Sequence, residues 1–234
     1  MSARLMTRIP VMLVAATLAF PAVSLAQTQK PKPQPAPARR PPPQSKSVQL
    51  GGYGMIGTVN FTAKESFDAI LGSSSGFIFG GGARVGLPYG GLFIDVGAWR
   101  FSADGQRVFV LNDQVYPLNV ATRISVTPLE FSGGWRFRIR QAPKLTPYLG
   151  GGFTAMTYSE TSDSATDAEN VDEVFSGYHL LGGAEYKLTR WLGIAGEATW
   201  TSVPDAIGEE GVAAAFDETN LGGASFRLKI TIGR

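Results

Sequence analysis

Cysteine is absent from the 234-residue chain, and histidine occurs only once. The lack of cysteine excludes disulfide bonds, a thiolate nucleophile and cysteine-ligated metals. A single histidine likewise excludes a histidine-rich metal site. After its first segment the sequence also lacks any run of 18 consecutive apolar residues, so it predicts no transmembrane helix there.

Acidic residues are missing from the first 47 positions, which instead carry seven of the 21 basic residues. Arg4 and Arg8 precede the apolar stretch PVMLVAATLAF, which is shorter than a bilayer-spanning helix. The small residues Ser24 and Ala26 fit a signal-peptidase cut after Ala26. We therefore predict a secretory signal peptide over residues 1–26, and the alternative is a retained N-terminal anchor.

Residues 27–47 (QTQKPKPQPAPARRPPPQSKS) form a proline-rich basic segment. Proline at nearly alternate positions favours polyproline II and disfavours a helix or a sheet. We predict a stiff periplasmic spacer, and the alternative is a basic arm that contacts an anionic polymer such as the cell wall. From Ser47 onward the remaining 14 basic residues stand against 19 acidic ones, a net charge of −5, which does not favour nucleic-acid binding.

From Val48 onward, apolar residues recur with a period of two, which is typical of β-strands. In SFRLKITIG they alternate with Arg227 and Lys229, and in LGIAGEATW they alternate with Glu197. One face of each strand is therefore apolar while the other carries full charges. We predict eight strands, at residues 48–61, 76–87, 91–103, 119–140, 146–158, 174–188, 191–202 and 219–233.

The connections between these strands alternate in length. Short ones at LPYG, QAPKL and Leu188–Arg190 alternate with long ones at 62–75, 104–118, 159–173 and 203–218. A soluble antiparallel sheet also shows a period of two, but eight alternating strands with short turns at one end and long loops at the other are typical of outer-membrane barrels. We therefore predict an all-β, eight-stranded antiparallel up-and-down transmembrane β-barrel. The alternative is a soluble periplasmic barrel.

Aromatic residues support the membrane interpretation because they mark both ends of the apolar tracks, as interfacial girdles do. Near the short turns the predicted girdle comprises Tyr89, Trp135, Phe137, Tyr148, Tyr186 and Trp191. Near the long loops it comprises Phe61, Phe77, Trp99, Phe101, Tyr158, Tyr178 and Trp200. An even number of strands puts both termini on one side of the membrane, which we predict to be the periplasmic side of the short turns.

Two local features depart from plain alternation. TAKESFDAILG (62–72) predicts a short helix, with a capping box formed by Thr62 and Glu65 and a stop at Gly72. This helix either folds over the barrel mouth or rests on the lipid interface. A change of phase at Thr127-Pro128 predicts a β-bulge.

Residues 48–234 resemble the small outer-membrane β-barrel domains related to the OmpA transmembrane domain. The resemblance lies in the signal peptide, the eight amphipathic strands and Gly-aromatic phrases such as PYLGGGFTAMTY and LLGGAEYKLTRWLG. It implies outer-membrane lipid and the barrel assembly machinery as partners, and a lumen plugged by paired charges and water. Such barrels usually end in an aromatic residue that the assembly machinery reads, whereas this sequence ends in Gly233-Arg234.

Charged residues opposite the apolar tracks are predicted to point into the lumen. Eight strands enclose only enough room for side chains, and an unpaired charge away from water is costly, so these charges should pair. Glu197 and Arg227, on neighbouring strands, are one expected pair. The predicted lumen charge network consists of Arg84, Asp95, Glu130, Arg136, Arg138, Glu185, Lys187, Glu197, Arg227 and Lys229.

Catalytic and metal-binding chemistry finds little support. His179 is predicted to be a lumen residue rather than a catalytic base, because the nearby Ser176 lies on the opposite face of a regular strand. The acidic segment DSATDAENVDE (163–173) is predicted to be a solvated extracellular loop, and the alternative is a divalent-cation site. We predict no catalytic residue, no metal site and no cofactor.

These expectations define a non-enzymatic outer-membrane protein with an envelope structural or surface-interaction role. Both termini would be periplasmic and the long acidic loops extracellular. The main alternative is a narrow, porin-like channel for small solutes. A lipid A-modifying outer-membrane enzyme is less favoured, and nucleic acid is not an expected partner.

Overall fold

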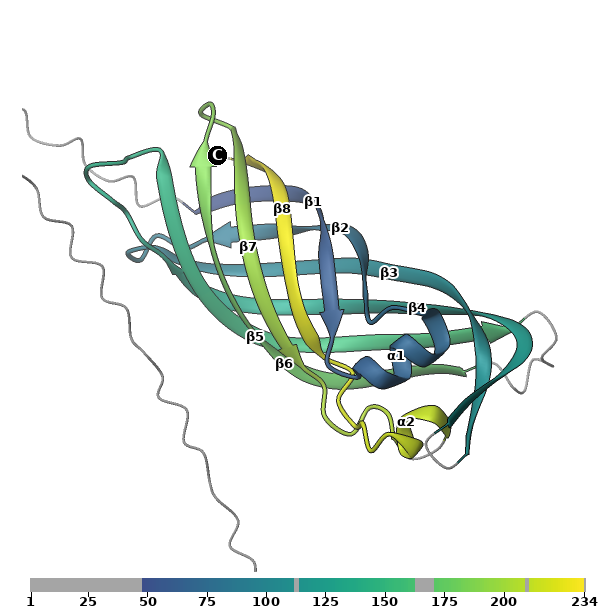
Figure 1. Ribbon diagram of the computed structural model, residues 1–234. Coiled ribbons are helices and arrows are strands. Elements are labelled where there is room, and N and C mark those ends of the chain that lie inside the picture. Colours follow the sequence, from purple (N-terminus) through teal and green to yellow (C-terminus); the bar gives the residue numbers. More distant parts are fainter. Residues whose placement is uncertain (1–47, 112–113, 163–170, 209–210, 234) are drawn as a thin grey trace, which may run out of the picture. The chain divides into compact units, whose positions relative to one another are not determined.

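The structure, a computed structural model, describes residues 48–111, 114–162, 171–208 and 211–233. The predicted signal peptide and proline-rich linker lie outside these residues. Eight antiparallel strands follow one another in sequence order, and β1 pairs with β8 to close a barrel (Figure 1). This arrangement confirms the predicted up-and-down topology. The strands are β1 (Gln49–Phe61), β2 (Ser75–Gly86), β3 (Leu92–Leu111), β4 (Gln114–Arg136), β5 (Leu145–Ser162), β6 (Val171–Lys187), β7 (Leu192–Ser202) and β8 (Gly223–Gly233).

In two of the four predicted long loops, 104–118 and 159–173, the residues that the structure describes are strand. β3 and β4 remain paired as far as Leu111 and Gln114. β5 continues to Ser162, and β6 begins at Val171. The prediction recognised strands by their apolar face, but a hairpin that projects beyond the barrel wall needs only backbone pairing. The β3–β4 hairpin carries polar side chains such as Asp104 and Arg123, whose ion pair is 2.6 Å long and exposed.

The predicted bulge at Thr127-Pro128 is wrong. Pairing between β4 and β5 runs through both residues without a shift, and β3–β4 pairing keeps the same register on either side. Ile124 and Val126 lie inside the barrel in the same phase as Glu130, and all three are buried. The interior therefore changes from polar to apolar along one unbroken face of β4. The register of β3–β4 shifts instead between Gln106 and Val108.

The outer surface of the barrel is apolar. Large hydrophobic side chains on every strand point outward, and Phe153 and Leu228 are 76% and 66% exposed. At the short-turn end the predicted girdle residues Tyr89, Trp135, Phe137, Tyr186 and Trp191 are all exposed. A continuous apolar exterior of this kind is unusual for a surface in water and is the surface that lipid requires.

The predicted girdles need correction at five positions. Phe61, Trp99, Phe101 and Tyr148 are buried inside the barrel, and Tyr158 packs there too, whereas Phe77, Tyr178 and Trp200 do face outward. Trp99 and Phe101 lie four and six residues after Asp95, so the period of two already placed them on the inward face. Strand phase therefore predicts whether an aromatic side chain points inward or outward better than its proximity to a loop does.

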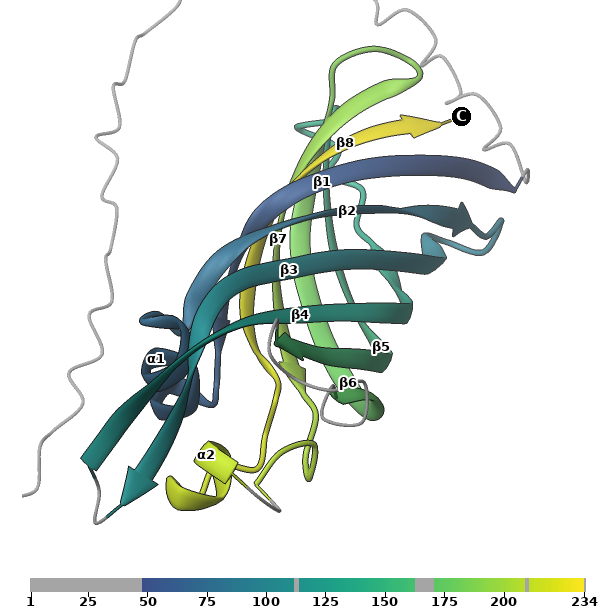
Figure 2. The same cartoon turned by 90° about the vertical axis from the view of Figure 1, so that its right-hand side faces the viewer.

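Two helices lie at the long-loop end, α1 (Lys64–Leu71) and α2 (Gly211–Ala215). Figure 2 shows both beside the far ends of β3 and β4. Neither helix in the described part of the chain is long and apolar enough to cross a membrane. The predicted stop of α1 is confirmed, because Gly72 has a left-handed φ of 74° and its N–H donates to the Asp68 carbonyl.

The predicted capping box at the start of α1 is wrong. Ala63 occupies the N-cap position and no side chain of the cap donates or accepts there. The carboxylate of Glu218, from the β7–β8 connection, instead accepts the backbone N–H groups of Glu65 and Ser66 at 3.0 and 2.9 Å. It also accepts the Ser66 hydroxyl at 2.6 Å. A distant carboxylate therefore meets the positive end of the helix and ties two connections together.

α1 folds over the barrel mouth, because Phe67 stacks on Phe61 with ring centroids 4.2 Å apart. Phe101 meets Phe61 edge-on at 5.1 Å. These rings belong to a cluster that we call the apolar plug: Met55, Val59, Phe61, Ala63, Phe67, Ile78, Trp99, Phe101, Ile124, Val126, Met156, Val203, Ala206 and Leu221, all buried.

Candidate functional site

Among the residues that the structure describes, four ion pairs occupy the barrel interior between the short turns and the apolar plug. Each pair joins one acid and one base, so the eight charges sum to zero. Every strand except β1 and β5 contributes a charge, and those two supply tyrosines that donate to carboxylates, Tyr53 and Tyr148. The pairs are Arg84–Asp95, Arg136–Glu185, Arg227–Glu130 and Lys229–Glu197.

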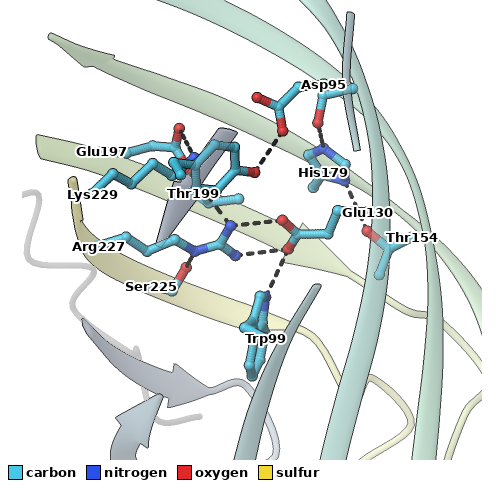
Figure 3. A network of polar contacts seen from close by, with 12 residues as sticks. Asp95, Trp99, Glu130, Thr154, His179, Glu197, Thr199, Ser225, Arg227 and Lys229 are labelled. Carbon is cyan, nitrogen blue, oxygen red and sulfur yellow. Dashed lines mark hydrogen bonds and ion pairs between the residues drawn. The ribbon is translucent and has the colours of Figure 1, made fainter. Parts of the chain in front are cut away.

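Glu130 and Arg227 form the centre of this network, as Figure 3 shows. Both guanidinium Nη atoms donate to the Glu130 carboxylate, at 2.6 and 2.7 Å. Trp99 Nε1 donates to the same carboxylate at 2.9 Å, and Arg227 Nε donates to the Ser225 hydroxyl at 3.0 Å. This two-bond geometry is the strongest form of the arginine–carboxylate pair, and it satisfies most of the polar groups that burial removes from water.

Glu197 sits between two cations. Lys229 Nζ donates to its Oε2 at 2.6 Å, and Tyr148 Oη donates to the same oxygen at 3.1 Å. Arg227 Nη1 lies 3.6 Å from the other carboxylate oxygen. Glu197 and Arg227 therefore do lie opposite each other as the sequence suggested, but each has a closer partner elsewhere.

Arg84 and Asp95 face each other across β2 and β3, joined by a 2.7 Å bond from Nε to Oδ2. Tyr53 Oη donates to the second carboxylate oxygen at 2.6 Å. Room for this tyrosine comes from Gly97, since a Cβ there would lie 2.5 Å from its hydroxyl oxygen. The Arg84 guanidinium packs on the rings of Phe93 and Tyr148, at 4.6 and 4.7 Å.

The remaining pair, Arg136–Glu185, has a bond of 2.6 Å and borders a cavity of about 300 Å³ at the short-turn end. Two residues predicted for the network do not join it. Arg138 lies two residues beyond the end of β4 and is exposed, because strand phase no longer directs its side chain there. Lys187 is the last residue of β6 and is also exposed, at the rim of the cavity.

His179 is buried and bonded at both ring nitrogens. Nε2 lies 2.8 Å from the Ser132 hydroxyl, and Nδ1 lies 2.8 Å from the Thr154 hydroxyl. The nearby Ser176 is exposed on the other face of β6, as the sequence indicated. The serine that does meet His179 is buried with it, so this pair has the spacing of a nucleophile and base but offers no open position to a substrate.

Sequence reasoning missed the neutral partners of the charges. Tyr53, Tyr148, Trp99, Ser132 and Thr154 all point inward and bond the network or His179. Ser132 is two residues from Glu130 and Trp99 is four from Asp95, so strand phase placed them inside. Their contacts depend on which residues lie opposite across the barrel, which phase alone does not give.

Metal binding finds no support in the described residues, where no three His, Asp or Glu side chains gather closely enough to hold an ion. Most of the acidic segment 163–173 lies outside them. Among the described residues, the eight interior charges neutralise one another in four pairs. The apolar plug packs between this polar layer and the long-loop end.

A scan against family models matches none, and a search of curated proteins finds no match. Solved structures do resemble the chain. A major outer membrane protein of Thermus thermophilus is similar over 80% of this chain and 100% of its own, with a TM-score of 0.51 and 11% identity. Neisserial surface protein A matches at a TM-score of 0.46 with 12% identity, over 80% of this chain and 95% of its own. The N-terminal barrel domain of Pseudomonas aeruginosa OprF matches at 0.42 with 10% identity, over 79% and 97%.

The chain therefore has the fold of the small eight-stranded outer-membrane β-barrels. At this level of identity the similarity extends to the fold alone. The predicted resemblance is confirmed at that level.

Proposed function

We propose that this chain is a non-enzymatic, non-conducting outer-membrane β-barrel protein with an envelope structural or surface-interaction role. The observation that carries this proposal is the filled interior. Four complementary ion pairs occupy the polar layer, and the apolar plug lies between that layer and the long loops. A solute path would have to break buried pairs and displace packed rings, both of which are costly.

The exterior supports the membrane part of the proposal. Outward side chains such as Ile56, Ile94, Leu149 and Phe226 are half or more exposed on four different strands. A soluble barrel would turn this face inward. Outer-membrane lipid is therefore the expected partner of the wall, and the barrel assembly machinery is the expected route of insertion.

Charge supports the proposed sidedness. The short-turn end carries Arg138, Arg140, Lys144 and Arg190, all exposed. The opposite end carries exposed acids instead, among them Asp172, Glu173, Asp205 and Asp217. We place the basic end and both termini in the periplasm, where residues 27–47 could reach the cell wall, and the acidic end outside the cell.

Fractionation and conductance test location and closure separately. We expect the protein in the outer-membrane fraction, with migration on gels that changes on heating as an intact barrel unfolds. Reconstituted into planar bilayers beside a sixteen-stranded porin as positive control, it should give no steady single-channel steps. Such steps would establish the channel alternative, and recovery in the soluble periplasmic fraction would contradict the membrane assignment.

Sidedness can be tested by labelling, because the native chain has no cysteine. Single variants Asp172→Cys and Lys144→Cys place one thiol at each end of the barrel. A membrane-impermeant maleimide added to intact cells should label the first and not the second. The reverse pattern would invert the proposed orientation. Lipid A from a deletion strain should keep its mass, and a changed mass would indicate an enzyme.

A further inference from the structure

A cleft of about 550 Å³ opens at the long-loop end, separate from the charge network. Its walls come from α1, from the β3–β4 hairpin, from the ends of β5 and β6, and from α2 with the segment before it. Figure 2 shows α1, α2 and this hairpin gathered at one end of the barrel. A concave site built from several loops on a rigid scaffold is a usual place for a ligand, and sites for small molecules span roughly 300–1,000 Å³.

The base of the cleft is apolar. Phe67 and Ile124 belong to the apolar plug and also line the cleft, so its floor is firmly packed from below. Ile70 and Phe175 extend this surface up the walls. Leu118, on the hairpin, also lines the cleft and is 54% exposed. An apolar body entering the cleft would remove these side chains from water.

The rim of the cleft is acidic. Among the described residues, four charged side chains line it, one base and three acids: Arg107, Glu160, Glu173 and Asp205. Arg107 Nε lies 3.5 Å from Glu160 Oε1, and Tyr158 Oη donates to the same carboxylate at 3.4 Å. Glu173 and Asp205 are exposed and form no ion pair with other described residues. These four described side chains carry a formal charge of −2, which favours a cation at the rim.

From this combination of an apolar floor and an acidic rim, the geometry points to a binding site for a small amphiphilic cation. Such a ligand carries an ammonium or guanidinium group on an aliphatic or aromatic body. The body packs on Phe67, Ile124 and Leu118, and the charge lies near Glu173 and Asp205. This inference goes beyond the proposed function, because binding depends on the cleft and not on whether the lumen conducts.

Binding can be measured with 4-phenylbutylammonium as the probe and the protein held in lipid nanodiscs. Titration calorimetry, corrected with nanodiscs that lack protein, should give saturable binding that weakens as salt is raised. Two analogues separate the contribution of the positive charge from that of the aromatic ring. 4-Phenylbutyrate keeps the body and reverses the charge, and butylammonium keeps the charge and removes the ring. Each should bind at least about tenfold more weakly.

Variants on the exposed walls locate the site without disturbing the barrel. The double variant Glu173→Gln, Asp205→Asn should weaken binding about tenfold, and Leu118→Ser should weaken it about fivefold. Asp172→Asn and Val115→Ser are the controls. Asp172 lies beside Glu173 on β6 and Val115 lies on β4 with Leu118, both are exposed, and neither lines the cleft. Absence of saturable binding, equal affinity for 4-phenylbutyrate, or an unchanged affinity in the double variant would overturn the inference.

Discussion

The interior of the barrel has two halves, and β4 runs through both. Toward the long loops its inward residues are Ile124 and Val126, and toward the short turns they are Glu130 and Ser132. The first half excludes water by packing rings and aliphatic chains, while the second neutralises charges in pairs. Packing is lost gradually when one side chain is trimmed. A set of buried ion pairs depends on every member, because the partner of a missing charge stays buried.

The largest expected effect comes from removing one member of the polar half. Arg227 has a side-chain exposure of 1%, and Arg227→Leu leaves four interior acids against three bases. We expect the free energy of unfolding to fall by about 3–5 kcal/mol, measured by denaturant titration in lipid vesicles with tryptophan fluorescence. Replacing both partners by leucine, in the double variant Glu130→Leu, Arg227→Leu, restores the charge balance. It should recover at least about 2 kcal/mol of that loss.

An exposed pair of equal length is the matched control for this prediction. Arg123 and Asp104 are also 2.6 Å apart, but their side chains are 63% and 73% exposed. Water screens such pairs, so Arg123→Leu should lower the free energy of unfolding far less than Arg227→Leu does. Equal losses at Arg227 and Arg123 would mean that burial of the network contributes nothing.

In the apolar half, trimming one ring should have a smaller and more local effect. Phe101→Ala removes a buried ring that contacts Phe61 and Phe67, and we expect a loss of about 3 kcal/mol in the free energy of unfolding. Phe109 on the same strand is 53% exposed, so Phe109→Ala should cost less than about 1 kcal/mol. If the two variants lost equal stability, the plug would not be a packed core.

The contrast between the halves also explains which parts of the molecule the sequence predicts. Strand number, topology and eight of the ten inward charges follow from the period of two, because strand phase determines which face a side chain takes. The inward apolar residues were misread. Ile124 and Val126 predicted a bulge, and Trp99 and Phe101 predicted a lipid girdle, because one face of each strand was expected to be apolar and the other charged.

Other features could not be predicted from the sequence because they depend on contacts between distant segments. The cap on α1 comes from Glu218, some 150 positions away, whereas a local rule favoured Thr62. Partners such as Ser132 for His179 are set by which strands meet across the lumen. The extended β3–β4 hairpin is held by backbone pairing, which leaves no apolar period in its sequence.

A still smaller effect is expected where the apolar half meets the loops. Glu218→Gln removes the charge that faces the N-terminus of α1 and weakens its hydrogen bonds to Glu65 and Ser66. Because Phe67 still anchors the helix in the plug, the loss should be local, about 1 kcal/mol. Hydrogen exchange at the amides of Glu65 and Ser66 should quicken several-fold, while Asp217→Asn leaves it unchanged. Unchanged exchange in Glu218→Gln would show that the link does not hold the helix.

An effect of the same size is expected at His179, whose two ring nitrogens lie within hydrogen-bond distance of the Ser132 and Thr154 hydroxyls. Ser132→Ala removes one of its two hydrogen bonds and should lower the free energy of unfolding by about 1 kcal/mol, the usual contribution of a neutral bond. Ser176→Ala, on the exposed face of β6, should change it by less than about 0.5 kcal/mol. Combining Ser132→Ala with Thr154→Val leaves both ring nitrogens without their hydroxyl partners, so it should cost about 2–3 kcal/mol. A double variant as stable as the native protein would mean that His179 finds other hydrogen-bond partners. The Ser132 and Thr154 hydroxyls would then contribute nothing to the stability of the polar half.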